Sequence, residues 1–148
     1  YAGFIQQLHE SGAELDEDAV IWYSTGDLIG LLGGDYDKLV YRRLKDCTGV
    51  VCYNDDVAMR LMELLRRCGR RIPEDMSIVS IDNARMSRLA NPPLTTFGHP
   101  SEAVGREAAL RLCNMIETGM RDAPVVIDMP LVERQSVVPY RPKSEGKE

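Results

Sequence analysis

The fold is decided by four consecutive motifs: GVVCYNDD (49–56), an amphipathic segment that ends at Gly69, MSIVSIDN (76–83) and PPLTTFG (92–98). The apolar residues of the first and third motifs follow no helical or alternating period, which is typical of strands that helices cover on both faces. Both motifs end in carboxylate and amide residues, so polar side chains are expected at the C-terminal ends of two parallel strands. Small ligands bind at this edge of an open parallel sheet, because strand ends and helix N-termini meet there.

The composition is that of an ordinary globular domain. The chain has 148 residues, of which 44% are apolar and 28% are charged, and this is enough for one domain with its own core. No apolar run approaches the roughly 18 residues of a membrane span, and no secretory signal opens the chain. The chain begins in mid-pattern at Tyr1 without an initiator Met, so we expect a fragment of a longer protein.

Charge and cysteine spacing argue against DNA binding by this chain and against a metal site. The net charge is −5, and a group of cations at Arg66, Arg67, Arg70 and Arg71 fits a solvated helix C-terminus better than a DNA-binding face. No zinc-like spacing relates the four cysteines, which are Cys47, Cys52, Cys68 and Cys113. We therefore expect buried free thiols in the reducing cytoplasm, with no cofactor and no membrane contact.

Four motifs in one order, spread over nearly the whole chain, resemble the LacI/GalR family of sugar-responsive transcriptional repressors. They are VCYND (51–55), RIPEDMSIVSID (71–82), PPLTTFGHP (92–100) and LVERQS (131–136). Within that family the chain looks most like the effector domain of the arabinose repressors, whose DNA-binding head is of the GntR type. The first, third and fourth motifs carry this finer resemblance.

The resemblance implies a type I periplasmic-binding-protein-like fold: α/β, with a parallel sheet flanked by helices, and two lobes that close on a ligand. Residues 1–138 would form part of this effector-binding domain, with 1–97 and 121–138 in the C-terminal lobe. Residues 98–120 would supply a crossing segment and a helix of the N-terminal lobe. In the family an arginine that contacts the effector lies on the first helix, and it would fall just upstream of this chain.

Two effector contacts are expected at the strand ends. Asn54 carries a donor and an acceptor on one planar group, which suits a sugar hydroxyl, whereas Asp55 is expected to be the N-cap of the following helix. Asp82 can accept two charge-assisted hydrogen bonds from adjacent hydroxyls; a cap on the short segment 83–90 is the alternative. The resemblance favours the ligand role for both Asn54 and Asp82.

Other effector contacts are expected from a strand at 19–23 and from the crossing segment. Thr25 follows that strand, and Trp22 and Tyr23 could cover the CH faces of a sugar; core and rim positions are the alternative for the two rings. His99 stands where relatives commonly carry a ligand-facing glutamine. It would add a pH response near neutrality, or serve only as a hinge residue.

The helix predicted over 56–68 has an apolar arc wider than one sheet face would cover. Met59 and Met62 extend this arc, and the resemblance implies that the helix packs against its counterpart across the two-fold axis of a homodimer. Arg60 and Glu63 are assigned to the same interface. A helix buried in its own core is the alternative.

The remaining predicted elements are simpler. The pattern over 28–44 fits one helix broken by glycines or two short helices equally well. The other predicted elements are a helix at 1–11, a helix at 101–118, strands at 125–129 and 131–135, and a charged, disordered tail at 139–148.

These observations predict a sugar-sensing and dimerisation domain of a cytoplasmic transcriptional repressor that responds to L-arabinose or a related monosaccharide. Operator DNA would be bound only through a domain outside this chain. One alternative is a sugar-binding protein of a transport system. Another is a Mg²⁺-dependent phosphoryl-transfer enzyme built on Asp55, Asp56 and Asp82. No glycine-rich phosphate loop or nucleophile set accompanies these carboxylates, so no enzymatic activity is predicted.

Overall fold

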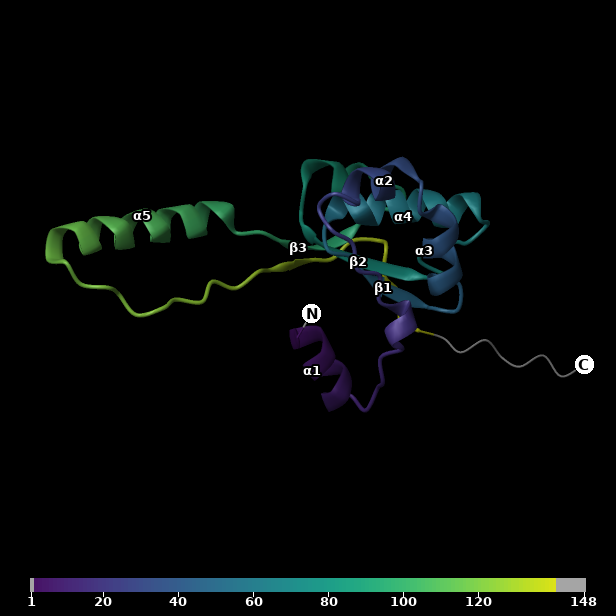
Figure 1. The fold of residues 1–148 in the computed structure, drawn as a ribbon, viewed down its shortest axis with the longest axis horizontal. Helices are drawn as coiled ribbons and strands as arrows, with labels where there is room; N and C mark the ends of the chain where they lie inside the picture. The colour runs from purple at the N-terminus through teal and green to yellow at the C-terminus, as the bar shows by residue number, and fades with distance from the viewer. Residues whose placement is uncertain (1, 141–148) are drawn as a thin grey trace, which may run out of the picture.

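The computed structural model describes residues 2–140 and shows a small α/β unit from which two helices project (Figure 1). The tail predicted from residue 139 lies, from 141 on, outside the described residues. The elements are α1 (Ala2–Glu10), η1 (Glu17–Ala19), α2 (Leu28–Gly33), α3 (Asp37–Leu44), β1 (Gly49–Val51), α4 (Asp55–Arg67), β2 (Ser77–Asp82), η2 (Arg85–Leu89), β3 (Thr95–Gly98), α5 (Ser101–Thr118) and β4 (Leu131–Val132).

The sheet has the order β1-β2-β3-β4. The first three strands are parallel, with Val51 opposite Val79 and Asp82 opposite Gly98, and β4 runs antiparallel to β3. Strands β1 and β2 are joined through α4, which is the crossover that parallel neighbours require. The predicted α/β class with a mostly parallel sheet is confirmed, and the C-terminal ends of β1, β2 and β3 meet at one edge.

The core lies between the sheet and α4. Strand β2 alternates: Ile78 and Ser80 are buried toward α4, whereas Val79 and Ile81 are half-exposed on the other face. Helices on both faces were expected, but within residues 2–140 only one face of the sheet is fully covered. The buried apolar residues are Val40, Leu44, Cys52, Ala58, Leu61, Met62, Leu64, Leu65, Met76, Ile78 and Leu94.

Two predicted strands do not form. Residues 20–24 and 125–129 are irregular, and the sheet consists of β1 to β4 without them. The segment 28–44 forms two helices, which was one of the two alternatives. Gly34 separates them with φ 98°, a left-handed conformation that glycine adopts without strain.

Helices α1 and α5 project from the α/β unit, and neither contains a buried residue (Figure 1). Helix α5 lies beside the chain that returns to β4 rather than beside the sheet. Asn114 Nδ2 donates to Asp122 Oδ1 at 2.8 Å, and the Arg111 guanidinium donates to the carbonyl of Ala123. Residues 119–130 therefore form one arm with α5. No helix in the described part of the chain is long and apolar enough to cross a membrane.

Candidate functional site

A polar residue lies at or just beyond the C-terminal end of each of the three parallel strands. Asn54 lies three residues beyond Val51, Asp82 lies three beyond Val79, and these two valines are paired between β1 and β2. His99 follows β3, and its backbone N–H donates to the carbonyl of Asp82 at 3.4 Å. The register thus brings Asn54, Asp82 and His99 to the same edge of the sheet.

The roles of Asn54 and Asp55 at the start of α4 differ from the prediction. Asn54, in an extended backbone conformation, is the N-cap, and its Oδ1 accepts a hydrogen bond from Val57 N at 3.0 Å. Asp55 is not the cap, because its carboxylate is drawn into the core by donors from the sheet. The cap uses the amide oxygen of Asn54, so its Nδ2 group is what remains to donate to a ligand.

Asp55 is the buried centre of a polar cluster, with 1% of its surface exposed. Its carboxylate accepts hydrogen bonds from Ser80 Oγ in β2, from Thr96 Oγ1 in β3 at 2.7 Å, and from Ala84 N at 2.6 Å. Sequence analysis missed this cluster. The available signal was the presence of Ser80 and Thr96 inside otherwise apolar strand motifs, since buried hydroxyls need partners.

The end of β2 has an unusual backbone. Asp82 and Asn83 have φ values of 115° and 54°, which non-glycine residues other than Asn and Asp rarely adopt. The Asp82 side chain is exposed, whereas Asn83 is half-buried and accepts a hydrogen bond from Arg134 Nη2 at 2.6 Å. The strand end therefore separates an exposed carboxylate from a neighbour that is held inside.

Two tyrosines lie beside the end of β1. The rings of Tyr23 and Tyr53 pack edge to face with centroids 6.4 Å apart. The Tyr23 hydroxyl is buried without a hydrogen-bond partner among the described residues, and burial, followed by the nearby Tyr53, raises its pKa. Tyr53 is 74% exposed and next to Asn54; sequence analysis did not select it. Its position directly before Asn54 was the signal.

The remaining predicted contacts are less closely placed. Trp22 is 72% exposed and Thr25 is exposed. His99 is exposed, and its Nδ1 lies 3.0 Å from Ser101 Oγ. His99 lines a hollow of ≈ 670 Å³ between the start of α5 and residues 125–127, and neither Asn54 nor Asp82 contributes to this lining.

The residues expected at a dimer interface are used within the chain. Met62 is 2% exposed in the core and Met59 packs against that core, because α2 and α3 cover the part of α4 that the sheet leaves open. Within the described chain Met62 is thus a core residue and Arg60 bonds to α2 and α3, which favours the alternative of a helix buried in its own core; the interface itself stays a prediction. Glu63 stays at the surface, beside Arg60.

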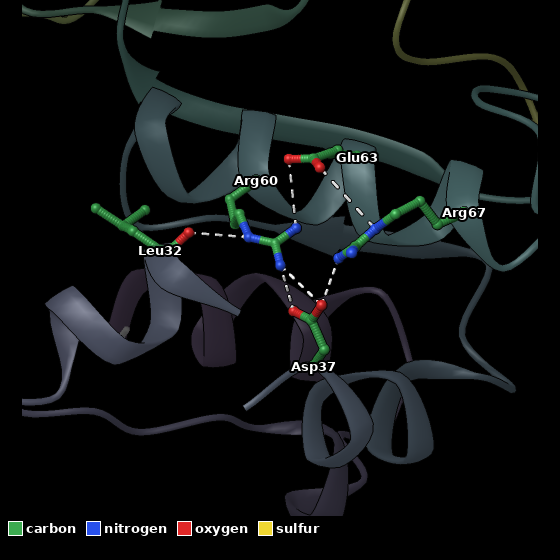
Figure 2. Close-up of polar contacts among 5 residues, drawn as sticks. All are labelled: Leu32, Asp37, Arg60, Glu63 and Arg67. Atoms are coloured by element: carbon green, nitrogen blue, oxygen red, sulfur yellow. Dashed lines mark hydrogen bonds and ion pairs between the residues drawn. The ribbon is translucent and has the colours of Figure 1, made fainter. Parts of the chain in front are cut away.

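Figure 2 shows how Arg60 joins three helices. Its guanidinium makes a bidentate pair with Asp37 of α3 at 2.6 and 2.7 Å and donates from Nε to the carbonyl of Leu32 in α2 at 3.0 Å. Arg67 pairs with the same Asp37, and Glu63 bridges both arginines. The Arg60 side chain is 14% exposed, so this cluster fastens α2 and α3 to α4.

No group of His, Cys, Asp or Glu in the described ranges has the arrangement needed to hold a metal ion. The four thiols are free, but only Cys52 is buried, and Cys68 and Cys113 are exposed. Cys68 ends α4 and Cys113 lies on the uncovered α5, so the prediction of buried thiols is wrong for these two. Burial, with the nearby Asp55 carboxylate, raises the pKa of Cys52 to about 12.

Comparison with known proteins gives consistent matches along the chain. Residues 2–137 match the family model for a periplasmic binding protein-like domain. The chain is 28% identical over 145 residues to the arabinose metabolism transcriptional repressor of Halalkalibacterium halodurans, a match that covers 98% of this chain and 39% of that protein. It is 32% identical over 143 residues to the HTH-type transcriptional repressor PurR of Pectobacterium carotovorum, covering 95% of this chain and 41% of that protein.

A solved structure shows the same arrangement of elements. A complex of the transcriptional regulator CelR with cellobiose superposes with a TM-score of 0.79 at 28% identity, over 91% of this chain and 41% of that one. The chain spans about two fifths of the length of the relatives that it matches.

Proposed function

The chain belongs to the family of periplasmic-binding-protein-like domains, and on this premise we propose that it is the sugar-sensing part of a transcriptional repressor. The resemblance to LacI-family repressors is confirmed, since the relatives include an arabinose metabolism repressor. The observation that carries the proposal is that the strand register places Asn54 and Asp82 at the C-terminal ends of two adjacent parallel strands, with His99 directly after the third. Small ligands bind at such an edge.

L-arabinose is the proposed effector. The exposed carboxylate of Asp82 would accept hydrogen bonds from two hydroxyls, and the Asn54 amide would donate to a third. The Tyr23 and Tyr53 rings offer an apolar wall for the CH face of the sugar, and Thr25 and Trp22 would complete it. The names of two matched proteins support a sugar: one is a repressor of arabinose metabolism and another is a complex with cellobiose.

The mechanism we propose is a change in lobe closure. Sugar would bind between this lobe and a second lobe outside the chain, and would favour one degree of closure because it contacts both lobes only in that state. A coupling of about 1–3 kcal/mol between sugar and operator DNA is typical of such switches. A GntR-type head, in a cytoplasmic protein, would bind the operator.

The arm formed by α5 is proposed to belong to the second lobe. Residues 98–120 are assigned to it from the sequence, and because Asp122 and Ala123 are hydrogen-bonded to α5 we extend the assignment to 98–130. An apolar set on this arm is exposed in the chain: Val104, Leu110, Leu112, Met115, Ile116, Val125 and Val126. We therefore expect the chain by itself to bind no measurable arabinose and to associate through this surface.

Homodimerisation is also proposed, through exposed apolar residues of α2 and η2 rather than through α4. Ile29, Met86 and Leu89 are more than half exposed. Sedimentation of the full-length protein tests this, and we expect Ile29→Asp to shift a dimer to a monomer. A dimer that survives Ile29→Asp combined with Leu89→Asp would exclude this surface.

The sensing function is tested by titrating the full-length protein with L-arabinose and by measuring operator DNA release. We expect Asp82→Ala to abolish sugar binding and release while operator binding without sugar persists, and Asp56→Ala, an exposed carboxylate in the first turn of α4, to behave as wild type. Sugar binding with no effect on DNA would favour the transport alternative, and Mg²⁺-dependent phosphate turnover the enzyme. The transcriptional regulators among the relatives support sensing over both.

A further inference from the structure

The corner made by Asp82, Asn83 and Ala84 is held by partners from other elements. Asn83 N donates to Thr96 Oγ1 at 3.2 Å, and Ala84 N donates to the buried carboxylate of Asp55 at 2.6 Å. The φ of Asp82, 115°, lies beyond the left-handed region that Asn83 occupies at 54°, and such a conformation persists only where the surroundings impose it. The direction in which Asp82 points therefore depends on these partners.

Arg134 ties the corner to the crossing strand and to η2. Its Nη2 donates to Asn83 Oδ1 at 2.6 Å, while its Nη1 donates to the carbonyl of Leu94 at 2.6 Å and to Ser87 Oγ at 3.1 Å. Its backbone N–H donates to Thr95 Oγ1 at 2.9 Å. The planar fork of a guanidinium fixes both sides of such a contact at once, and a lysine ammonium does not.

The buried Asp55 carboxylate also holds the 82–84 corner in place. Its two oxygens collect donors from β2, from β3 and from the corner itself. Thr96 takes part twice, because its hydroxyl donates to Asp55 and accepts from Asn83 N. The corner is thus bonded to the strand that crosses toward the α5 arm, and not only to its own strand.

We propose that Arg134 is a positioning residue for the effector site: together with Asp55 it holds the 82–84 corner in the shape that presents the Asp82 carboxylate at the sheet edge. The proposal rests on the proposed function for what Asp82 binds, but the shape of the corner is defined without ligand. Arg134 acts through Asn83 and is not itself placed against the sugar.

The first test needs no ligand. In the full-length protein, Arg134→Lys should speed amide hydrogen exchange at Asn83 and Ala84 by at least about tenfold, which corresponds to the loss of one charge-assisted hydrogen bond. Val79 inside β2 should be unaffected, and Arg88→Lys, an exposed arginine of η2, is the matched control. Unchanged exchange at both amides would overturn the proposal whatever the ligand is.

The second test asks whether the effect passes through Asp82. Titrated with L-arabinose, Arg134→Lys should weaken affinity by about tenfold or more, and Asn83→Asp, which keeps an acceptor and tolerates the backbone, should retain it. In an Asp82→Asn background the same lysine substitution should cost less than about twofold. Equal losses in both backgrounds would mean a general structural role and would overturn the proposal.

The two proposals can fail separately. If Asp82→Asn leaves arabinose affinity unchanged, Asp82 is not a sugar contact, and amide exchange alone then decides the role of Arg134. Should Arg134→Lys fail to fold, Asn83→Ala removes the same contact from the other side, and its exchange and affinity must differ from those of Asn83→Asp for the proposal to stand.

Discussion

Helices α4 and α5 differ in how much of their surface is buried. Both follow strands of the parallel sheet and both carry apolar side chains, yet α4 buries six residues and α5 buries none. Helix α4 meets β2 on one side and α2 and α3 on the other, whereas α5 extends away from the sheet (Figure 1). An apolar stripe stabilises a helix only where a partner surface is present, since most helical stability in proteins comes from packing.

The largest expected difference between the two helices is in the stability lost when a leucine is shortened to alanine. Leu65 in α4 is 0% exposed and Leu112 in α5 is 53% exposed. In this chain, Leu65→Ala should lower the free energy of unfolding by about 2–5 kcal/mol, and Leu112→Ala should change it by about 0.5 kcal/mol or less. Urea denaturation measures both.

The same pair of variants sharpens the domain proposal in the full-length protein. If the second lobe covers α5, Leu112→Ala should lower the free energy of unfolding of the full-length protein nearly as much as Leu65→Ala does. An equally small effect of Leu112→Ala in both proteins would show that α5 stays uncovered.

An intermediate difference is expected between the ion pairs of the two helices. Arg60 is largely covered and bonds to α2 and α3, whereas Arg106 in α5 pairs with Glu102 at the surface. Arg60→Met should cost about 1–3 kcal/mol, because Asp37 loses part of its charge-assisted bonding, and Arg106→Met about 0.5 kcal/mol or less. Thermal unfolding at low and high salt compares them; similar losses would contradict the role given to the Arg60 cluster.

The smallest expected effect concerns the labelling rates of two thiols, a comparison that needs no substitution. Burial raises the pKa of Cys52 to about 12, so at pH 8 its thiol remains protonated as well as covered. Cys113 on α5 is exposed. A thiol reagent at pH 8 should therefore label Cys113 at the rate of a free thiol in solution. Cys52 should be labelled only when the chain unfolds. Equal labelling rates in the folded chain would show that the β1 end is open to solvent.

Much of the fold follows from local patterns. The runs ending at Asn54 and Asp82 predicted two parallel strands, and the helical period between them predicted α4 within a residue at each end. The failures, at 19–23 and 125–129, are apolar segments that pair with no strand of the sheet. A pattern of side chains can show that a segment favours extended structure, but backbone pairing depends on what lies beside it.

The sequence by itself determined the class of the domain, the family motifs and the polar residues at the strand ends, because these depend on residues close together in the chain. Only the tertiary structure decided that Asn54 caps α4, that Asp55 is buried, that Met62 and Arg60 are used internally, and that Arg134 reaches Asn83 across 51 positions. Which donor a side chain bonds to depends on the three-dimensional meeting of distant segments. The spacing of residues within one motif therefore cannot predict such contacts between motifs.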